Sequence, residues 1–339
     1  MRVGLCFDGF YSVHEVIELA KLADDAGMHS LWMSDHLCFR DSLTTSMALL
    51  ASTEKIKVAA APMSPYSRNP IITAMSIATM DEFAPGRVIA SPGTGNAAAL
   101  KEAGMESPHP LQTMREYVEI LRRYLKGDAV NFQGKMFQIN GAKMGFVPPA
   151  PIDMYITAVR PLMLRLGGEI GDGVLLSGGC SPGYIARCVE EIKIGAEKAS
   201  KSVKQCDVAG FVTAAVSKDP KEAVEANKLF LAYIFRNVHH AENIRLGGGT
   251  VDQEGLAAAV AKRDWEAAKQ FISDEIVHAH SIAGTPADCR KQLENFVAGG
   301  LSLPILLPTG TQQARRQVIQ MARELAGWLL RVYFYLFIK

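Results

Sequence analysis

The chain lacks the signatures of several function classes. Its six cysteines include no Cys-x-x-Cys pair, which argues against a zinc site or a dithiol redox motif. Neither a P-loop nor a Gly-x-Gly-x-x-Gly run follows the first predicted strand, which argues against nucleotide hydrolysis and a Rossmann site. The His278-Ala-His280 pair has too weak a carboxylate pattern near it for a metal site, and we expect none.

Charge and hydrophobic length argue against two kinds of partner. The formal net charge is +1 without a basic block, so we expect no nucleic-acid partner. The apolar C-terminal tail, residues 326–339, is shorter than the about 20 residues of a spanning helix, so we expect no membrane partner and assign the tail no function. Asp8 follows Met1 too early for a signal peptide, and unpaired cysteines favour the cytoplasm.

What is present is an alternation of short apolar runs with amphipathic helical runs, the pattern of βαβ units. A chain of 339 residues that is 48% hydrophobic has room for a large core. The predicted strands are Arg2–Phe7, Ser30–Met33, Ile56–Ala61, Arg87–Ser91, Met154–Ala158, Gly173–Leu176, Val208–Val216 and Leu303–Leu307. The predicted helices are His14–Ala26, Ser46–Thr53, Pro70–Phe83, Leu111–Leu125, Pro161–Ile170, Tyr184–Ala199, Pro286–Ala298 and Gln312–Leu325, with a surface hairpin at Asn131–Asn140.

These elements predict an α/β protein, a (β/α)8 TIM barrel. Residues 1–325 form one domain in this interpretation. A helical segment without strands, at about 220–282, is inserted before the last βα unit.

The run Leu31–Leu43 carries the clearest functional signal. It begins as an apolar strand and ends in Ser34, Asp35 and His36. Residues just past the carboxyl end of a parallel strand line the mouth of such a barrel, so an acid and a histidine there are candidates for chemistry. The structural alternatives are a helix cap for Asp35 and a core position for His36. The histidines farther along the chain, His109, His239, His240, His278 and His280, read as surface or insertion residues.

Four other strand ends are rich in glycine and small polar residues. Glycine lets backbone N–H groups approach a ligand closely, and the start of a following helix favours an anion. The Ser177-Gly178-Gly179 turn before Pro182 suits a phosphate, with Arg160 as a charged contact. Ordinary βα turns use the same residue types, but four such turns together favour a ligand. The four segments are 91–96, 157–161, 177–182 and 308–311.

A series of motifs also occurs in a characteristic order. The motifs are Trp32–His36 with Arg40-Asp41, Pro65–Pro70, Gly93–Asn96, Pro161–Gly173 and Gly284–Asp288. In this order they resemble the bacterial luciferase-like superfamily. Within it, they are most similar to the branch that depends on the deazaflavin coenzyme F420, particularly methylenetetrahydromethanopterin reductase. The resemblance covers about residues 1–310.

The resemblance implies a barrel that holds coenzyme F420, or alternatively FMN, at its carboxyl-terminal mouth. It implies that Asp35 and His36 lie beside the ring as the catalytic pair. The implied cofactor contacts are Ser34, Ala61, Pro62, Thr94, Gly95, Asn96, Ala158, Val159, Ser177, Gly178 and Gly179. The family has a cis peptide bond at the end of the third strand, and the motif alignment predicts a cis Ala61–Pro62 bond here.

One residue departs from the family pattern. The reductase branch carries a glutamate, a proposed proton donor, at the end of the first strand, and this chain has Cys6 there. A thiol is a weaker acid than a carboxyl group. Asp8 and His36 are the candidates that remain for the proton chemistry.

We therefore predict an oxidoreductase that transfers hydride between a reduced deazaflavin or flavin and a small organic substrate, with a methylene-tetrahydropterin as one candidate and His36 as proton relay. The alternatives are an FMN-dependent monooxygenase that uses oxygen and a non-enzymatic flavin-fold binding protein. An apolar helix face with Met47, Leu49 and Leu50 favours a homodimer or higher homo-oligomer. The sequence leaves the substrate and the choice of cofactor open.

Overall fold

The barrel predicted from the sequence is confirmed. The computed structural model describes the backbone of residues 1–337 and the side chains of residues 1–324. Eight parallel strands close into a ring in the order β11-β1-β2-β3-β4-β7-β8-β9, because β9 pairs with both β8 and β11. Their bounds are β1 (Gly4–Phe7), β2 (Ser30–Ser34), β3 (Lys57–Met63), β4 (Val88–Pro92), β7 (Asp153–Ala158), β8 (Gly173–Leu176), β9 (Asp207–Val216) and β11 (Leu303–Pro308).

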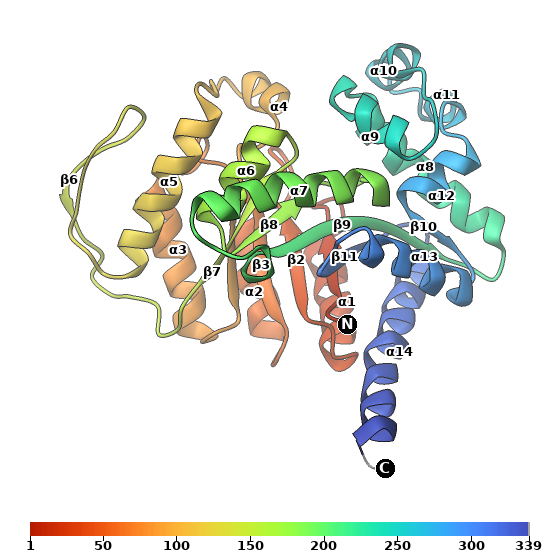
Figure 1. The fold of residues 1–339 in the computed structure, drawn as a ribbon, viewed down its shortest axis with the longest axis horizontal. Helices are drawn as coiled ribbons and strands as arrows, with labels where there is room; N and C mark the ends of the chain where they lie inside the picture. The colour runs from red at the N-terminus through yellow and green to blue at the C-terminus, as the bar shows by residue number, and fades with distance from the viewer. Residues whose placement is uncertain (338–339) are drawn as a thin grey trace.

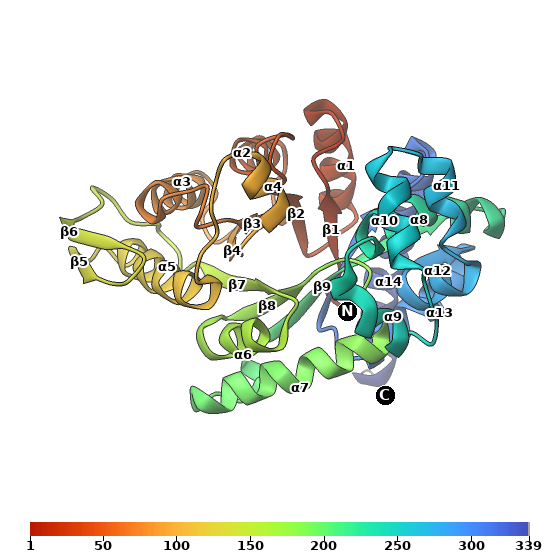
Figure 2. The same ribbon diagram turned by 90° about the horizontal axis from the view of Figure 1, so that it is seen from above.

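Helices surround this ring (Figures 1 and 2). They are α1 (Val13–Asp25), α2 (Ser42–Ser52), α3 (Pro70–Phe83), α5 (Pro110–Leu125), α6 (Pro161–Ile170), α7 (Pro182–Lys198), α13 (Pro286–Ala298) and α14 (Gln312–Phe337). The last helix continues beyond the predicted end at Leu325, and the side chains of the apolar tail lie outside the described residues. In the part of the chain that the structure describes, no helix has the length and apolar character to cross a membrane.

The segment before the last βα unit is helical, as predicted. It comprises α8 (Pro220–Phe235), α9 (Ala241–Leu246), α10 (Gln253–Ala261), α11 (Trp265–Gln270) and α12 (Asp274–His280), with a short 3₁₀ turn at Val238–His240. A second 3₁₀ turn, Val203–Gln205, lies before β9. A short strand that was not predicted, β10 (Ile282–Gly284), then pairs with the end of β9. We call α8–α12 the insertion.

Two further elements lie outside the ring. A short helix, α4 (Ala97–Glu102), follows β4 and was not predicted, while the predicted hairpin is present as β5 (Val130–Gln133) and β6 (Gln138–Ala142). Figure 1 shows α9–α11 at the top of the view, at the same end of the barrel as α4. Since α4 directly follows a strand, this is the carboxyl-terminal end, where barrel enzymes carry their sites.

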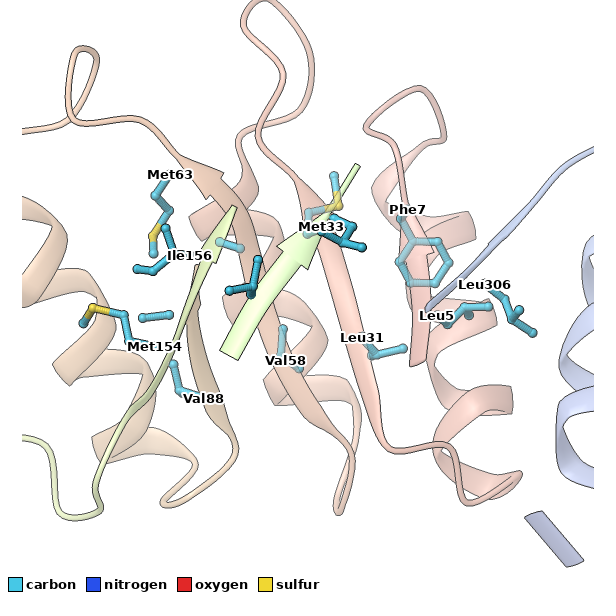
Figure 3. Close-up of a cluster of buried hydrophobic side chains, with 14 of the residues drawn as sticks. Leu5, Phe7, Leu31, Met33, Val58, Met63, Val88, Met154, Ile156 and Leu306 are labelled. Atoms are coloured by element: carbon cyan, nitrogen blue, oxygen red, sulfur yellow. The ribbon is translucent and has the colours of Figure 1, made fainter. Parts of the chain in front are cut away.

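The strands are buried on both faces, which explains their continuous apolar runs. Outward-facing residues such as Leu5, Leu31 and Met33 pack in the cluster between the strands and the helices (Figure 3). Inward-facing Trp32 fills the lumen, where its ring meets Tyr155 edge-on at a centroid distance of 5.4 Å. Because this apolar plug closes the lumen, a ligand site must lie above it at the mouth.

Candidate active site

A ring of polar side chains stands above the apolar lumen. Alternate residues of a strand face the same side, so the residue two positions after each lumen residue also faces the barrel axis. Cys6 is followed in this way by Asp8, and Trp32 by Ser34. The same rule adds Ser91 on β4, Thr157 on β7, Ser177 after β8 and Thr213 on β9. The strand ends therefore form a polar mouth above the apolar side chains that fill the lumen.

The ends of β2 and β8 lie across this mouth from each other. In the ring order, three strands separate β2 from β8 in either direction. The predicted catalytic pair, Asp35 and His36, is thus on one side, and the Ser177-Gly178-Gly179 turn is on the other. A ligand that contacts both groups has to extend across the barrel.

His36 is accessible from the mouth. Its ring lies 6.4 Å from the ring of Phe39, and Phe39 in turn packs edge-on against Phe10 at 4.5 Å. Among the side chains of residues 1–324, none hydrogen-bonds to the His36 ring. Desolvation by the surrounding protein lowers its pKa, against the smaller opposing effect of Asp35. A neutral imidazole with both nitrogens free can accept and donate a proton.

Asp35 has a different environment. Both of its carboxylate oxygens accept hydrogen bonds from Arg68, each at 3.1 Å. Arg68 also pairs with Asp41, whose side chain caps the start of α2. The backbone N–H of Asp35 donates to Ala61 O at 2.9 Å, which joins the ends of β2 and β3. Asp35 therefore anchors a partly exposed ion network at the end of β2. Sequence reasoning missed Arg68, although it lies within the Pro65–Pro70 motif.

The end of β1 holds a thiol below a carboxyl group. Cys6 is fully buried, and burial raises the pKa of its thiol above the ordinary range, while its Sγ lies 3.6 Å from Ser34 Oγ. Asp8 is 8% exposed and accepts a hydrogen bond from Phe10 N–H at 3.0 Å. Desolvation also raises the pKa of Asp8, against the opposing effects of that backbone bond and of Arg315. Asp8 is the more acidic of the two groups and can hold a proton nearer neutral pH than an exposed carboxyl group.

The ends of β3 and β4 approach each other closely. The Ala61–Pro62 bond is cis, as predicted. A Cβ atom at Gly93 would lie 2.6 Å from Pro62 Cβ and 2.7 Å from Thr157 Cβ, so only glycine fits there. Gly95 has a φ of +73°, which also requires glycine.

The residues after β4 that were predicted to contact the cofactor already use some of their polar groups in hydrogen bonds within the protein. The side-chain oxygen of Asn96 caps α4 by accepting from Ala98 and Ala99 N–H. Thr94 O accepts from Ser64 Oγ at 3.1 Å. Contacts from these residues to a ligand must therefore use the remaining backbone groups or the Thr94 side chain.

On the far side, Ser177 offers an unused hydroxyl. Its Oγ is buried and has no partner, and the same is true of Thr213 Oγ1 on the adjacent strand. Among the described residues, the backbone N–H groups of Gly178 and Gly179 donate to no protein acceptor. Buried polar groups are nearly always satisfied, so these donors indicate a missing polar ligand.

The end of β7 beside this turn is fixed by packing. Ala158 points outward into the core between strands and helices, so only its backbone can reach the mouth. Val159 O accepts from Tyr184 Oη of α7 at 3.0 Å. Arg160 contacts the His239 ring of the insertion, at 2.6 and 2.7 Å from its two nitrogens, and pairs with no carboxylate among residues 1–324. An arginine without an acidic partner beside the turn adds to its capacity for an anion.

The residues that hold the turn were missed by sequence reasoning. The segment 179–183 has the Gly-x-Ser-x-Gly spacing of a serine-hydrolase nucleophile motif. However, Ser181 is 1% exposed and its Oγ caps the start of α7. Ser181 instead bonds to Asn243, and His280 bonds to Gly179 O, both from the insertion. His240 and His280 lie in the insertion, one of the two places expected for them, and both are buried there. Among the described residues, no group of three metal-ligating side chains occurs.

Comparison with known proteins decides the family. The model of the luciferase-like monooxygenase family matches residues 6–303. The chain belongs to this family. A luciferase-like relative, 5,10-methylenetetrahydromethanopterin reductase of Methanolobus tindarius, is 32% identical over 303 residues, which cover 89% of this chain and 92% of the relative. The F420-dependent glucose-6-phosphate dehydrogenase of Nocardia farcinica is 30% identical over 331 residues, which cover 93% and 94%.

A solved structure of the family has the same architecture. The coenzyme F420-dependent tetrahydromethanopterin reductase of Methanopyrus kandleri superposes with a TM-score of 0.85 at 27% identity, over 94% of this chain and 97% of that one. The barrel, the insertion and the mouth thus belong to the shared luciferase-like fold.

The mouth fits a phosphate-bearing ring cofactor. The orphaned Ser177 Oγ and the free N–H groups of the glycine turn are donors suited to a phosphate. At the ends of β3 and β4, Gly93 lies so close to Pro62 and Thr157 that a Cβ atom there would clash with both, so the backbone of this part of the mouth is open to a ligand only at a glycine. A ligand that contacts both the turn after β8 and the accessible His36 after β2 has to extend across the barrel, as a ring joined to a phosphate through a flexible chain can.

Proposed function

We propose that this protein is a coenzyme F420-dependent oxidoreductase that transfers hydride to a small organic substrate, a methylene-tetrahydropterin in the first instance. The observation that carries the proposal is the pairing of an unsatisfied phosphate-type turn at β8 with an accessible histidine across the mouth at β2. The names of the relatives support F420 over FMN. The reduced coenzyme would supply the hydride, while the protein binds and orients the reactants.

Each side of the mouth has a role in this proposal. Ser177, Gly178 and Gly179 hold the phosphate, with Arg160 beside them, and the backbones of Ala158 and Val159 hold the ribityl chain. Ser34, Ala61, Pro62, Thr94, Gly95 and Asn96 surround the ring.

His36 relays the proton that must accompany hydride transfer, because its neutral imidazole is accessible and unpaired. Asp8 is a second proton donor of the same mouth, since burial favours its protonated form. Cys6 stays a neutral thiol. Asp35 acts as a positioning residue, because Arg68 occupies both of its oxygens.

A titration tests the choice of cofactor. The protein is titrated with F420 and with FMN without oxygen, and binding is followed by fluorescence. We expect binding of F420 in the micromolar range and much weaker binding of FMN. Tight binding of FMN alone would instead support the monooxygenase alternative, and binding of neither would support the non-enzymatic one.

We infer one domain over residues 1–325. Ala215 of β9 and Ala283 of β10 share a hydrophobic core with the insertion, and Phe230 of α8 packs against the lumen cluster. A segment that shares its core with the barrel strands is expected to unfold together with them. The five buried, unpaired cysteines and the exposed Cys38 are consistent with a reducing compartment, and we propose the cytoplasm.

We also propose a homodimer, on a different surface from the predicted one. Leu49 and Leu50 are buried in the barrel core and cannot contact a partner. Ile72, Met75 and Phe83 lie on one face of α3 and are exposed. An Ile72→Glu variant is expected to shift the protein from dimer to monomer in light scattering.

A further inference from the structure

The glycine turn after β8 is held from behind by two buried residues of the insertion. Asn243 of α9 is fully buried, and its Nδ2 donates to Gly179 O at 2.7 Å. Its Oδ1 accepts from Ser181 N–H at 2.8 Å. One side chain thus clamps both ends of the Gly179–Ser181 segment.

His280 of α12 donates to the same carbonyl. Its Nδ1 lies 2.8 Å from Gly179 O. Because a carbonyl oxygen only accepts, Nδ1 carries the proton and Nε2 is the bare nitrogen. Nε2 has no partner and is packed against Gly247, where a Cβ atom would come within 2.4 Å of it. The imidazole is therefore fixed in one orientation and one tautomer.

These two donors fix the direction of one peptide group. In a trans peptide the C=O and N–H bonds point in opposite directions. With Gly179 O turned toward Asn243 and His280, the N–H of Cys180 points away from the insertion residues. This N–H donates to no protein acceptor among the described residues. Gly179 has a φ of +76°, a conformation that other residues adopt with difficulty.

We propose that Asn243 and His280 are positioning residues that turn the Gly179–Cys180 peptide so that its N–H, and not its C=O, is presented to the phosphate of the cofactor. The inference rests on the proposed function, since it needs a phosphate-bearing ligand in the mouth. Without the two donors, the peptide is free to turn its carbonyl oxygen toward the anion, which repels it. The insertion thereby takes part in cofactor binding without touching the cofactor.

A matched pair of variants separates this role from a general structural one. An asparagine side chain places its amide nitrogen near the position of histidine Nδ1, whereas glutamine places it near Nε2. His280→Asn therefore keeps the donor to Gly179 O, and His280→Gln loses it. Asn243→Ala removes the other donor, and thermal unfolding identifies whether that variant folds.

The measured quantity is the Kd for F420 and for its phosphate-free analogue, in which the ribityl chain ends in a hydroxyl group. We expect His280→Gln to weaken F420 binding about tenfold and to leave the Kd of the analogue within about twofold, while His280→Asn retains both affinities. Asn243→Ala, if folded, should show the same selective loss.

The outcomes distinguish this inference from the proposed function. Equal weakening of both ligands, or no change in either, would overturn the positioning role while wild-type F420 binding leaves the proposed function intact. Wild-type protein that binds neither ligand would overturn the proposed function and the positioning role together.

Discussion

The two sides of the barrel mouth are built in different ways. On the β2 side, Ser34, Asp35 and His36 are consecutive residues, and the partner of Asp35 is Arg68, 33 residues away. On the β8 side, the turn at Gly179 depends on Asn243 and His280, which are 64 and 101 residues away. The functional residues of the first side are thus neighbours in the sequence. The second exists only after the insertion has folded onto the barrel.

The difference extends to the chemistry of the two sides. His36 is accessible and unpaired, as a group that exchanges protons must be. His280 is buried and fixed, and burial lowers its pKa to about 4, so that it stays neutral near pH 7. The two histidines therefore differ in role: His36 transfers a proton, whereas His280 fixes the orientation of a peptide group.

The largest expected effect tests the β2 side. His36→Ala should lower turnover by roughly 10²- to 10⁴-fold, the usual contribution of a general acid or base, and leave the Kd for F420 within about threefold. Steady-state kinetics and a binding titration check this. His29→Gln is a matched control, because His29 lies just before the opposite end of the same strand, and this variant should keep its activity. Unchanged turnover in His36→Ala would remove the relay role from this residue.

The next effect tests the β8 side. Ser177→Ala should weaken F420 binding by about tenfold, since one hydrogen bond to a charged group is lost. The free energy of unfolding without ligand should not fall, because Ser177 Oγ has no partner in the protein. Calorimetry with and without F420 measures both quantities. A loss of stability without a loss of affinity would make this hydroxyl a structural group.

Much of the β2 side could be predicted from the sequence, and little of the β8 support could. Asp35 and His36 directly follow a predicted strand. In a parallel barrel the direction of the strand alone places its carboxyl end at the mouth, so these two residues could be assigned to the site from sequence. Asn243 gives no such signal, since its partners are backbone groups whose places depend on tertiary packing. His280 was placed only as a surface or insertion residue, without its supporting role, for the same reason: its helix is short, and only the folded insertion shows which of its faces is buried.

The fold itself followed from local patterns. Each strand was predicted within two or three residues because fully buried parallel strands are continuous apolar runs. The short α4 and β10 escaped prediction, since six and three residues carry too little periodicity. Leu49 and Leu50, which were expected to favour an oligomer, are buried in the barrel core. An apolar helix face looks the same in the sequence whether it packs against the core or against a partner.

The smallest effect concerns stability and pH. His280 has a pKa of about 4 in the folded protein against its ordinary value of 6.5. The unfolded chain therefore binds a proton that the folded chain excludes, so stability is fully present above pH 6.5 and is lost as the pH falls toward 4. Between about pH 7 and pH 5, this loss amounts to about 2 kcal/mol.

Urea unfolding at these two pH values measures the change in the free energy of unfolding. His280→Asn does not titrate in this range and should lose correspondingly less stability. His240, whose pKa is also about 4, remains in both proteins. Desolvation is the main cause of its lowered pKa, so the loss of the smaller effect of His280 changes its own contribution little. Equal losses in the two proteins would show that His280 is not the group that links stability to pH.

The central claim is that the mouth brings a reduced deazaflavin and a small substrate together for hydride transfer. Its most direct test uses reduced F420 with deuterium at both positions of the hydride-bearing carbon, together with 5,10-methylenetetrahydromethanopterin, without oxygen. The product is analysed by mass spectrometry. The expected result is one deuterium in the methyl group of the product, and formation of this product roughly 10²- to 10⁴-fold more slowly in His36→Ala at unchanged F420 affinity. An unlabelled product, or no product from a protein that binds F420 and the pterin, would contradict the assigned reaction.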